Sequence, residues 1–432
     1  MKQVRWALTG ALLFFGPMAR AQGADAPPTA DLVWVALSAV LVLLMTPALA
    51  MFYGGMVRRI NVLSTMMHSF IAMGVISILW LALGYSLAFG TAGSGWIGDF
   101  SRTMGNGIST SEPAASGGSS ALFMLFQMMF AIITPALISG AIAERMKFGS
   151  YVAFIALWSL VVYSPVACWV WNADGWLFKH GALDFAGGTV VHLASGVAAL
   201  AAAIVLGKRR ALIHREPIPP NNLTMTLVGA GLLWFGWIGF NAGSALAMNG
   251  VAVNAFISTH MAAAAGMIGW LVVERIKTGK ATALGAASGL VGGLVGITPG
   301  AGFVAPVGAV AVGLLTGAAC YLAIGLKNKL GYDDSLDVVG VHGAGGLLGA
   351  VLTGVFASEA ANPAVKDALA GGRMELVVKQ VVAVGAVGVY SFVVTMGLLL
   401  ALKAMGGIRA NAEQEDAGLD ETMHGEAGYN LY

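Results

Sequence analysis

The sequence is poor in charged residues. Asp, Glu, Lys and Arg make up 10% of its 432 residues, while hydrophobic residues make up 58%. An ordinary soluble domain carries about 25% charged residues. No soluble core could bury this much apolar side chain, so a soluble fold is excluded and a lipid bilayer must surround most of the chain. The formal net charge of +2 gives no reason to expect a nucleic-acid partner.

Cysteine is also scarce, since the chain has only Cys168 and Cys320. Both lie in apolar stretches, and the topology derived below places them toward opposite faces of the membrane, so we expect no disulfide between them. Neither has the neighbours that are typical of a metal site. We interpret both as small core residues and expect neither a metal nor another cofactor.

The N-terminus has the pattern of a secretory signal. Lys2 and Arg5 precede an apolar run over residues 6–15, and Ala19-Arg20-Ala21 matches an A-x-A cleavage site. We predict a cleaved signal peptide over residues 1–21 and an exported N-terminus in a bacterial inner (cytoplasmic) membrane. The alternative is an uncleaved first span, but about ten apolar residues are too few to cross a bilayer.

Beyond the signal, the chain alternates between apolar stretches and short polar loops. Eleven stretches are long enough to span a bilayer, so residues 22–404 are predicted to form an all-α domain of about eleven transmembrane helices. Residues 90–119 should form an external loop, and residues 405–432 a polar, acidic cytoplasmic tail. The predicted spans lie near residues 32–54, 62–89, 120–143, 148–171, 187–207, 223–247, 251–274, 281–298, 302–326, 337–357 and 374–402.

Lysine and arginine predict the orientation. With the N-terminus outside, the inner segments contain 15 of these residues and the outer segments contain 5. Because cytoplasmic loops are enriched in Lys and Arg, the chain should be N-out and C-in. Such a topology needs an odd number of spans, in agreement with eleven.

Two of the predicted spans open alike. Span five begins with Asp184 and reaches His192, and span ten begins with Asp337 and reaches His342. Span ten is the fifth span after span five, so the two helices run in opposite directions. This is typical of an inverted repeat, here of spans 1–5 and 6–10, whose interface commonly holds a transport site.

Ionisable residues inside membrane spans are costly and point to function. The repeat pairs His192 with His342, and we interpret them as a polar relay rather than as packing residues, because neutral imidazoles both donate and accept hydrogen bonds. His68 and His260 have no such mate and are interpreted as packing, with the role of His260 left open. Asp184 should face the outer side, where it attracts a cation or caps its helix.

Four further residues leave alternatives open. Asp337 has the same two interpretations as Asp184, on the inner side. Trp171, at the outer end of span four, is either an ordinary aromatic-belt residue or a cation-binding ring. Phe130 and Phe240, taken alone, are packing or lipid-facing residues.

Several motifs together resemble the ammonium transporter (Amt/Mep/Rh) family, especially its bacterial Amt branch. DFAGGTVVH (residues 184–192) and GFNAGS (residues 239–244) are highly specific, and the similarity covers essentially the whole mature chain. Further matches lie at residues 126–130, at 143–145, from 288 to 299 and from 337 to 356.

The resemblance implies roles for these residues. Trp171, Ser244 and Phe130 are similar to an outer ammonium-recruitment site, which Asp184 supports. Phe130 and Phe240 resemble a stacked phenyl gate. The family is trimeric, with one pore per subunit.

Two more expectations follow from the resemblance. His192 and His342 are similar to a twin-histidine pore, and Asp337 would lie at its inner vestibule. One residue more than the usual spacing stands between Trp171 and the DFAGG run, so nearby Trp169 is an alternative recruiter. The acidic tail resembles a regulatory C-terminus on which a PII-type nitrogen-signalling protein docks, although its composition alone favours a solvated, disordered segment.

We therefore expect a transporter, not an enzyme. Ammonium would be recruited outside, lose a proton and cross as ammonia. Two alternatives stay open for the proton, which either remains outside or follows by a separate route. An ammonium sensor that signals through its tail is the alternative. An intramembrane metalloenzyme using His192, His342 and Asp184 lacks an accompanying motif, and a generic cation channel lacks a carbonyl filter or a carboxylate ring.

Overall fold

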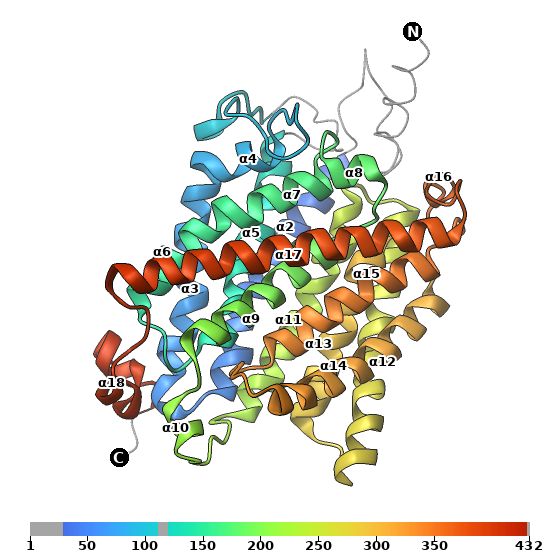
Figure 1. The fold of residues 1–432 in the computed structure, drawn as a ribbon. Helices are drawn as coiled ribbons and strands as arrows, with labels where there is room; N and C mark the ends of the chain where they lie inside the picture. Colours follow the sequence, from blue (N-terminus) through green and yellow to red (C-terminus); the bar gives the residue numbers. More distant parts are fainter. Residues whose placement is uncertain (1–28, 111–119, 430–432) are drawn as a thin grey trace.

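The computed structural model describes residues 29–110 and 120–429. The predicted signal peptide over residues 1–21 lies outside the described residues. Within them, eleven helical segments are long and apolar enough to cross a membrane, as predicted, and no β-strand is present. They form one bundle, with α4, α8 and α16 toward one end and α10 and α18 toward the other (Figure 1).

The spans follow the predicted ranges within a few residues, because apolar length and flanking charge decide where a helix crosses a bilayer. Short helices α10 (Arg210–Ile213) and α16 (Val365–Ala368) lie in loops, and α8 (Trp176–His180) extends the fourth span. The spans are α2 (Thr29–Met56), α3 with α4 (Val62–Leu79, Tyr85–Phe89), α5 (Ser120–Ile142), α6 with α7 (Phe148–Trp158, Ser164–Trp171), α9 (Ala194–Leu206), α11 (Leu223–Ala242), α12 (Gly250–Thr278), α13 (Ala283–Ile297), α14 (Pro306–Leu330), α15 (Gly345–Phe356) and α17 (Arg373–Gly406).

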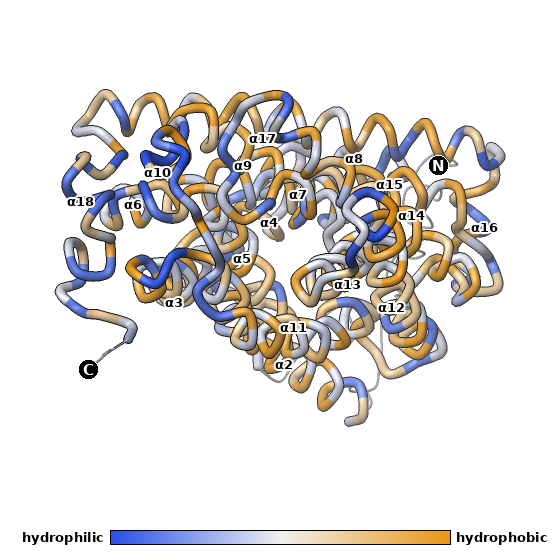
Figure 2. The backbone as a smooth tube through the Cα atoms, turned by 90° about the horizontal axis from the view of Figure 1, so that it is seen from below, coloured by the Kyte–Doolittle hydropathy of each residue, from blue (hydrophilic) through white to orange (hydrophobic). Residues whose placement is uncertain are grey.

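The outside of the bundle is apolar. Figure 2 shows hydrophobic segments around its edge and hydrophilic ones at α10 and α18. Large hydrophobic side chains on the outer helices are well exposed, which is the pattern of a lipid-facing surface. Examples are Val40 (63% exposed), Ile268 (55%), Val378 (53%) and Val389 (66%).

The two histidine-bearing spans share an unusual local geometry. Each opens with π-helical turns, η5 (Gly188–Leu193) before α9 and η8 (Val339–Ala344) before α15, and these two turns pack against each other. π-Turns inside helices are rare and are frequent at functional sites; two further spans of this chain contain them, at Trp80–Gly84 and Ser159–Tyr163. The shared geometry agrees with the predicted inverted repeat.

The last helix lies across both halves of the bundle. With 34 residues, α17 is about 51 Å long, well beyond the ~30 Å hydrocarbon core, so it must be strongly tilted. It runs diagonally over α6, α9 and α15 (Figure 1). Side-chain hydrogen bonds tie it to other spans: Gln380 to Leu183, Ser391 Oγ to the Ala194 carbonyl (2.7 Å) and Trp158 Nε1 to Thr395 Oγ1 (2.9 Å).

The C-terminal tail is folded onto the bundle up to residue 429, unlike the solvated, disordered segment that composition alone favours. Glu415 in α18 (Ala412–Ala417) is buried and forms an ion pair with Arg409 (2.8 Å). Asp420 accepts hydrogen bonds from the backbone N–H groups of Leu63 and Ser64 at the start of α3 (3.0 and 2.7 Å). Two of the acidic side chains that composition assigned to solvent are thus buried or held against the bundle, Glu415 by Arg409 of the tail and Asp420 by the start of α3.

Candidate functional site

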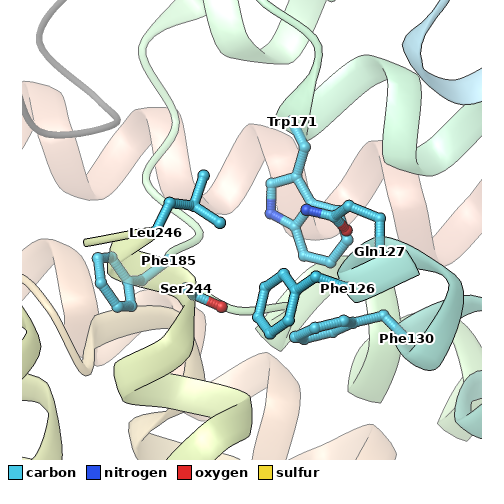
Figure 3. A pocket seen from close by; sticks show the side chains of 7 residues that line it. All are labelled: Phe126, Gln127, Phe130, Trp171, Phe185, Ser244 and Leu246. Atoms are coloured by element: carbon cyan, nitrogen blue, oxygen red, sulfur yellow. The ribbon is translucent and has the colours of Figure 1, made fainter. Parts of the chain in front are cut away.

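Seven side chains enclose a pocket toward the end of the bundle that carries α4 and α8 (Figure 3). Trp171 is the last residue of α7, and its indole N–H donates to the Asp184 carbonyl (3.0 Å). The pocket is lined by Phe126, Gln127, Phe130, Trp171, Phe185, Ser244 and Leu246.

The structure distinguishes between the two candidate tryptophans. Trp169 points elsewhere: its N–H donates to the Trp96 carbonyl (2.8 Å), and its ring packs on Trp96 and Trp176. Trp171 is therefore the tryptophan that lines the pocket together with Ser244 and Phe130.

Ser244 presents lone pairs to this pocket. It lies in the short turn that follows α11, and its hydroxyl donates to the Phe240 carbonyl one turn earlier (2.8 Å). Because that bond uses its only proton, Ser244 Oγ is left as an acceptor. Leu246 reaches the same pocket through a left-handed backbone (φ 56°), which is uncommon for a residue other than glycine.

Asp184 acts as a helix cap. Its carboxylate accepts the backbone N–H groups of Gly187, Gly188 and Thr189, each at 2.7 Å, and that of Val190 at 3.3 Å, together with the Thr189 hydroxyl. Burial raises the pKa of Asp184, and the hydrogen bonds from Thr189, Gly187 and Gly188 oppose that rise. The carboxylate also borders a second pocket beside Trp171 and Ser244. The capping interpretation is confirmed, and the negative charge lies close to the outer pocket.

Two phenyl rings separate this pocket from the interior. Phe130 lines the pocket, Phe240 lines a chamber beneath it, and their ring centroids are 4.4 Å apart with the planes inclined by 40°. Phe126 packs edge-on against Phe130 (4.9 Å). Both gate candidates are buried. The pairing of Phe130 with Phe240 that the resemblance implies corresponds to a direct ring contact.

The two histidines meet inside the chamber. Nδ1 of His192 and Nδ1 of His342 are 3.2 Å apart, so one ring donates and the other accepts. The His192 ring stacks on Phe240 and on Trp237, with centroids 5.8 and 5.3 Å away, and its Nε2 has no hydrogen-bond partner. The other lining residues are apolar or aromatic: Met45, Leu49, Phe52, Ile133, Leu137, Val191, Leu233, Trp237, Phe240 and Val291.

The remaining membrane histidines lie outside the chamber. His68 is buried and packs against Tyr151 (4.3 Å) and Phe148. His260 stacks on Trp234 (5.0 Å) and is exposed on α12. Neither lines the pocket or the chamber, which agrees with the packing interpretation.

At the inner end, the interpretation of Asp337 as a helix cap is wrong. Asp334 makes that contact, accepting the Val339 N–H (2.7 Å), whereas Asp337 adopts a left-handed backbone (φ 63°) and forms an ion pair with Lys327. The carboxyl that corresponds to Asp184 is therefore Asp334. Asp337 stays a prediction for the inner vestibule.

Sequence reasoning missed three functional candidates, Gln127, Trp237 and Asp334. A signal for Asp334 was present, since His192 lies eight positions after Asp184 and His342 lies eight positions after Asp334. Gln127 lies in the matching run at residues 126–130, but no role was assigned to it, because its place in the pocket depends on how α5 packs against α7. Within the described residues, no group of three or more His, Cys, Asp or Glu side chains could hold a metal ion.

Eleven membrane-length helices around a mainly apolar interior, with two histidines in contact at its centre, define a multi-pass membrane protein of the transporter type. Comparison with known proteins gives the family. The model of the Ammonium Transporter Family matches residues 33–429, and the chain therefore belongs to that family.

Relatives and solved structures agree. The chain is 50% identical over 402 residues to an ammonium transporter of Bacillus subtilis (strain 168), covering 92% of this chain and 98% of the relative. Its fold matches the crystal structure of Saccharomyces cerevisiae Mep2 with a TM-score of 0.84 and 37% identity, over 90% of this chain and 89% of Mep2. It also matches a structure described as a sensor Amt protein, with a TM-score of 0.84 and 30% identity, over 91% of this chain and 98% of that protein. Membership of this family supports ammonium transport as the function.

Proposed function

We propose that the chain takes up ammonium across a bacterial inner membrane by recruiting it in the outer pocket, removing a proton and conducting ammonia past the two histidines. The observation that carries the proposal is the contact between His192 and His342 inside an otherwise apolar chamber behind the Phe130–Phe240 pair. The homotrimeric state and a PII-type partner for the tail are part of the proposal, and they rest on the family resemblance.

The outer pocket suits a small cation. Aromatic faces from Trp171, Phe126 and Phe130 attract cations through their quadrupoles, and Ser244 Oγ offers an acceptor. The carboxylate of Asp184 adds negative potential close by.

The apolar chamber then selects by chemistry. Moving an unpaired ion into a low-dielectric interior costs up to tens of kcal/mol by Born estimates, whereas a neutral polar molecule costs only several. Ammonium can give up a proton and continue as ammonia, and potassium cannot. Paired neutral imidazoles would offer ammonia a donor and an acceptor along an otherwise apolar wall.

The test compares His192→Ala and His342→Ala with His260→Ala, which removes a membrane histidine outside the chamber. Purified protein in liposomes is given an ammonium pulse, while current on a solid-supported membrane and internal pH are recorded, with potassium as the control ion. Either pore variant should lose ammonium flux or admit potassium, while His260→Ala behaves as wild type. Unchanged flux and selectivity in both pore variants would defeat the relay role.

The same recording separates two forms of transport. A saturable ammonium current without a potassium current means that net charge moves, whereas alkalinisation without current means a neutral ammonia channel. The second candidate function is an ammonium sensor that signals through its tail, which the similarity to a sensor Amt protein favours. Wild-type protein that gives neither signal would support the sensor.

A further inference from the structure

Gln127 has an unsatisfied hydrogen-bond acceptor at the outer pocket. It lies on α5, one residue after Phe126, and only 6% of the side chain is exposed. Its Oε1 is buried and has no hydrogen-bond partner. Leaving a buried acceptor unpaired costs about 1–3 kcal/mol, so such groups need an explanation.

The pocket around Gln127 is short of donors. The Trp171 N–H is used by the Asp184 carbonyl (3.0 Å), and the Ser244 proton is used by the Phe240 carbonyl (2.8 Å). The other lining residues are apolar: Phe126, Phe130, Phe185 and Leu246. Apart from the amide N–H groups of Gln127 itself, the lining therefore offers acceptors and ring faces to whatever enters.

Figure 3 shows the amide of Gln127 beside the Trp171 ring, with Ser244 across the pocket. Rotation about the last side-chain torsion turns the amide oxygen toward either side, because the amide nitrogen and oxygen have nearly the same shape. An occupant that carries only donors satisfies this oxygen and Ser244 Oγ at the same time. Ammonium, with four N–H groups and no lone pair, is such an occupant.

We propose that Gln127 is an ammonium-binding residue of the outer pocket, whose amide oxygen accepts an N–H of the bound cation opposite Ser244. This inference rests on the proposed function, since it assigns a further contact at the same recruitment site. Gln127 thereby raises affinity for ammonium without taking part in the later steps within the chamber.

The test is the ammonium concentration that gives half-maximal flux into liposomes for wild type, Gln127→Leu and Gln127→Glu. Leu keeps the approximate volume and removes the acceptor. Loss of a hydrogen bond to a charged group corresponds to about a tenfold to hundredfold weaker affinity. We expect the half-saturating concentration to rise by that factor in Gln127→Leu, with little change in maximal flux, and to stay equal or fall in Gln127→Glu, which keeps an acceptor.

Thermal denaturation in detergent separates binding from folding. Removing an unpaired buried acceptor does not destabilise the protein, so Gln127→Leu should melt at or above the wild-type temperature. The same change at Gln380, whose amide makes three hydrogen bonds to Leu183 and Ala350, should lower it. A binding residue thus loses affinity without losing stability.

Three results would overturn the inference. An unchanged half-saturating concentration in Gln127→Leu would show that Gln127 makes no contact with the bound ammonium. Equal losses in Gln127→Leu and Gln127→Glu, with a lower melting temperature in both, would assign Gln127 a structural role only. A wild type without ammonium flux would overturn the proposed function and this inference together, whereas the first two results leave the proposed function intact.

Discussion

Asp184→Ala should strongly destabilise the protein, because one carboxylate satisfies five donors at the start of the fifth span. Four are backbone N–H groups at residues 187–190, and the fifth is the Thr189 hydroxyl. An intramolecular hydrogen bond contributes about 1 kcal/mol net, and a negative charge at a helix start adds about 0.3–1 kcal/mol. Water entering the truncated site recovers part of the loss, so we expect about 2–4 kcal/mol.

Asp184→Asn should cause an intermediate loss of stability. One amide oxygen replaces two carboxylate oxygens, so the variant keeps the bonds to Gly187 and Gly188 and loses those made by the other oxygen. We expect it to lose about half as much stability as Asp184→Ala. Asp174 is the matched control: it lies on the same outer side, its side chain is 49% exposed and pairs with Lys179, and Asp174→Ala should cost less than about 0.5 kcal/mol.

The assay is the fraction of monodisperse protein after heating in detergent, measured by size-exclusion chromatography at one heating rate, because membrane-protein unfolding is commonly irreversible. The expected order of stability is wild type and Asp174→Ala, then Asp184→Asn, then Asp184→Ala. If Asp184→Ala melted together with Asp174→Ala, the carboxylate would not be the cap that holds this helix start.

Two further predictions concern the inner face. Burial and the charge of Asp337 raise the pKa of Asp334 to about 6, above the ordinary Asp value, so its ionised form costs stability above about pH 6 and nothing below about pH 4. Asp334→Asn keeps an oxygen for the Val339 N–H, so it should be more stable than wild type at pH 7.5, by at most ~3 kcal/mol, and equally stable at pH 4. The measurement is thermal denaturation of both proteins over this pH range. A stability difference that does not change with pH would contradict the prediction. Asp420→Ala removes two hydrogen bonds that hold the tail on α3. It should therefore make the backbone amides of residues 407–429 exchange hydrogen about ten times faster. An unchanged exchange rate would mean that other contacts hold the tail.

Much of the fold could be predicted because membrane spans obey simple physical rules. Apolar length and Lys/Arg placement gave all eleven spans to within a few residues, apart from the extension of α6–α7 into α8 and the greater length of α17. Those extensions follow from tertiary packing, which hydropathy does not record. The π-turns at η5 and η8 were equally invisible, since they leave the residue pattern unchanged.

The site was predictable where a motif carried it. The histidine pair and the phenyl pair are in direct contact, as the resemblance implied. The aspartate of the second repeat was assigned to the wrong residue because Asp337 stands at the predicted span start, and the backbone that turns it away is a tertiary feature. The roles of Gln127 and Leu246 could not be predicted, since what singles them out is an unpaired oxygen and a left-handed backbone.

The long helix α17 restricts how this molecule can move. It lies outside the repeat, yet its hydrogen bonds reach the segment before span five through Leu183 and span ten through the Ala350 carbonyl, both from the single side chain of Gln380. Rocking one half of the repeat against the other would break these buried bonds in every cycle. Displacing a phenyl ring breaks none of them. We therefore expect the motion that accompanies transport to be local, with the two halves of the repeat staying in place.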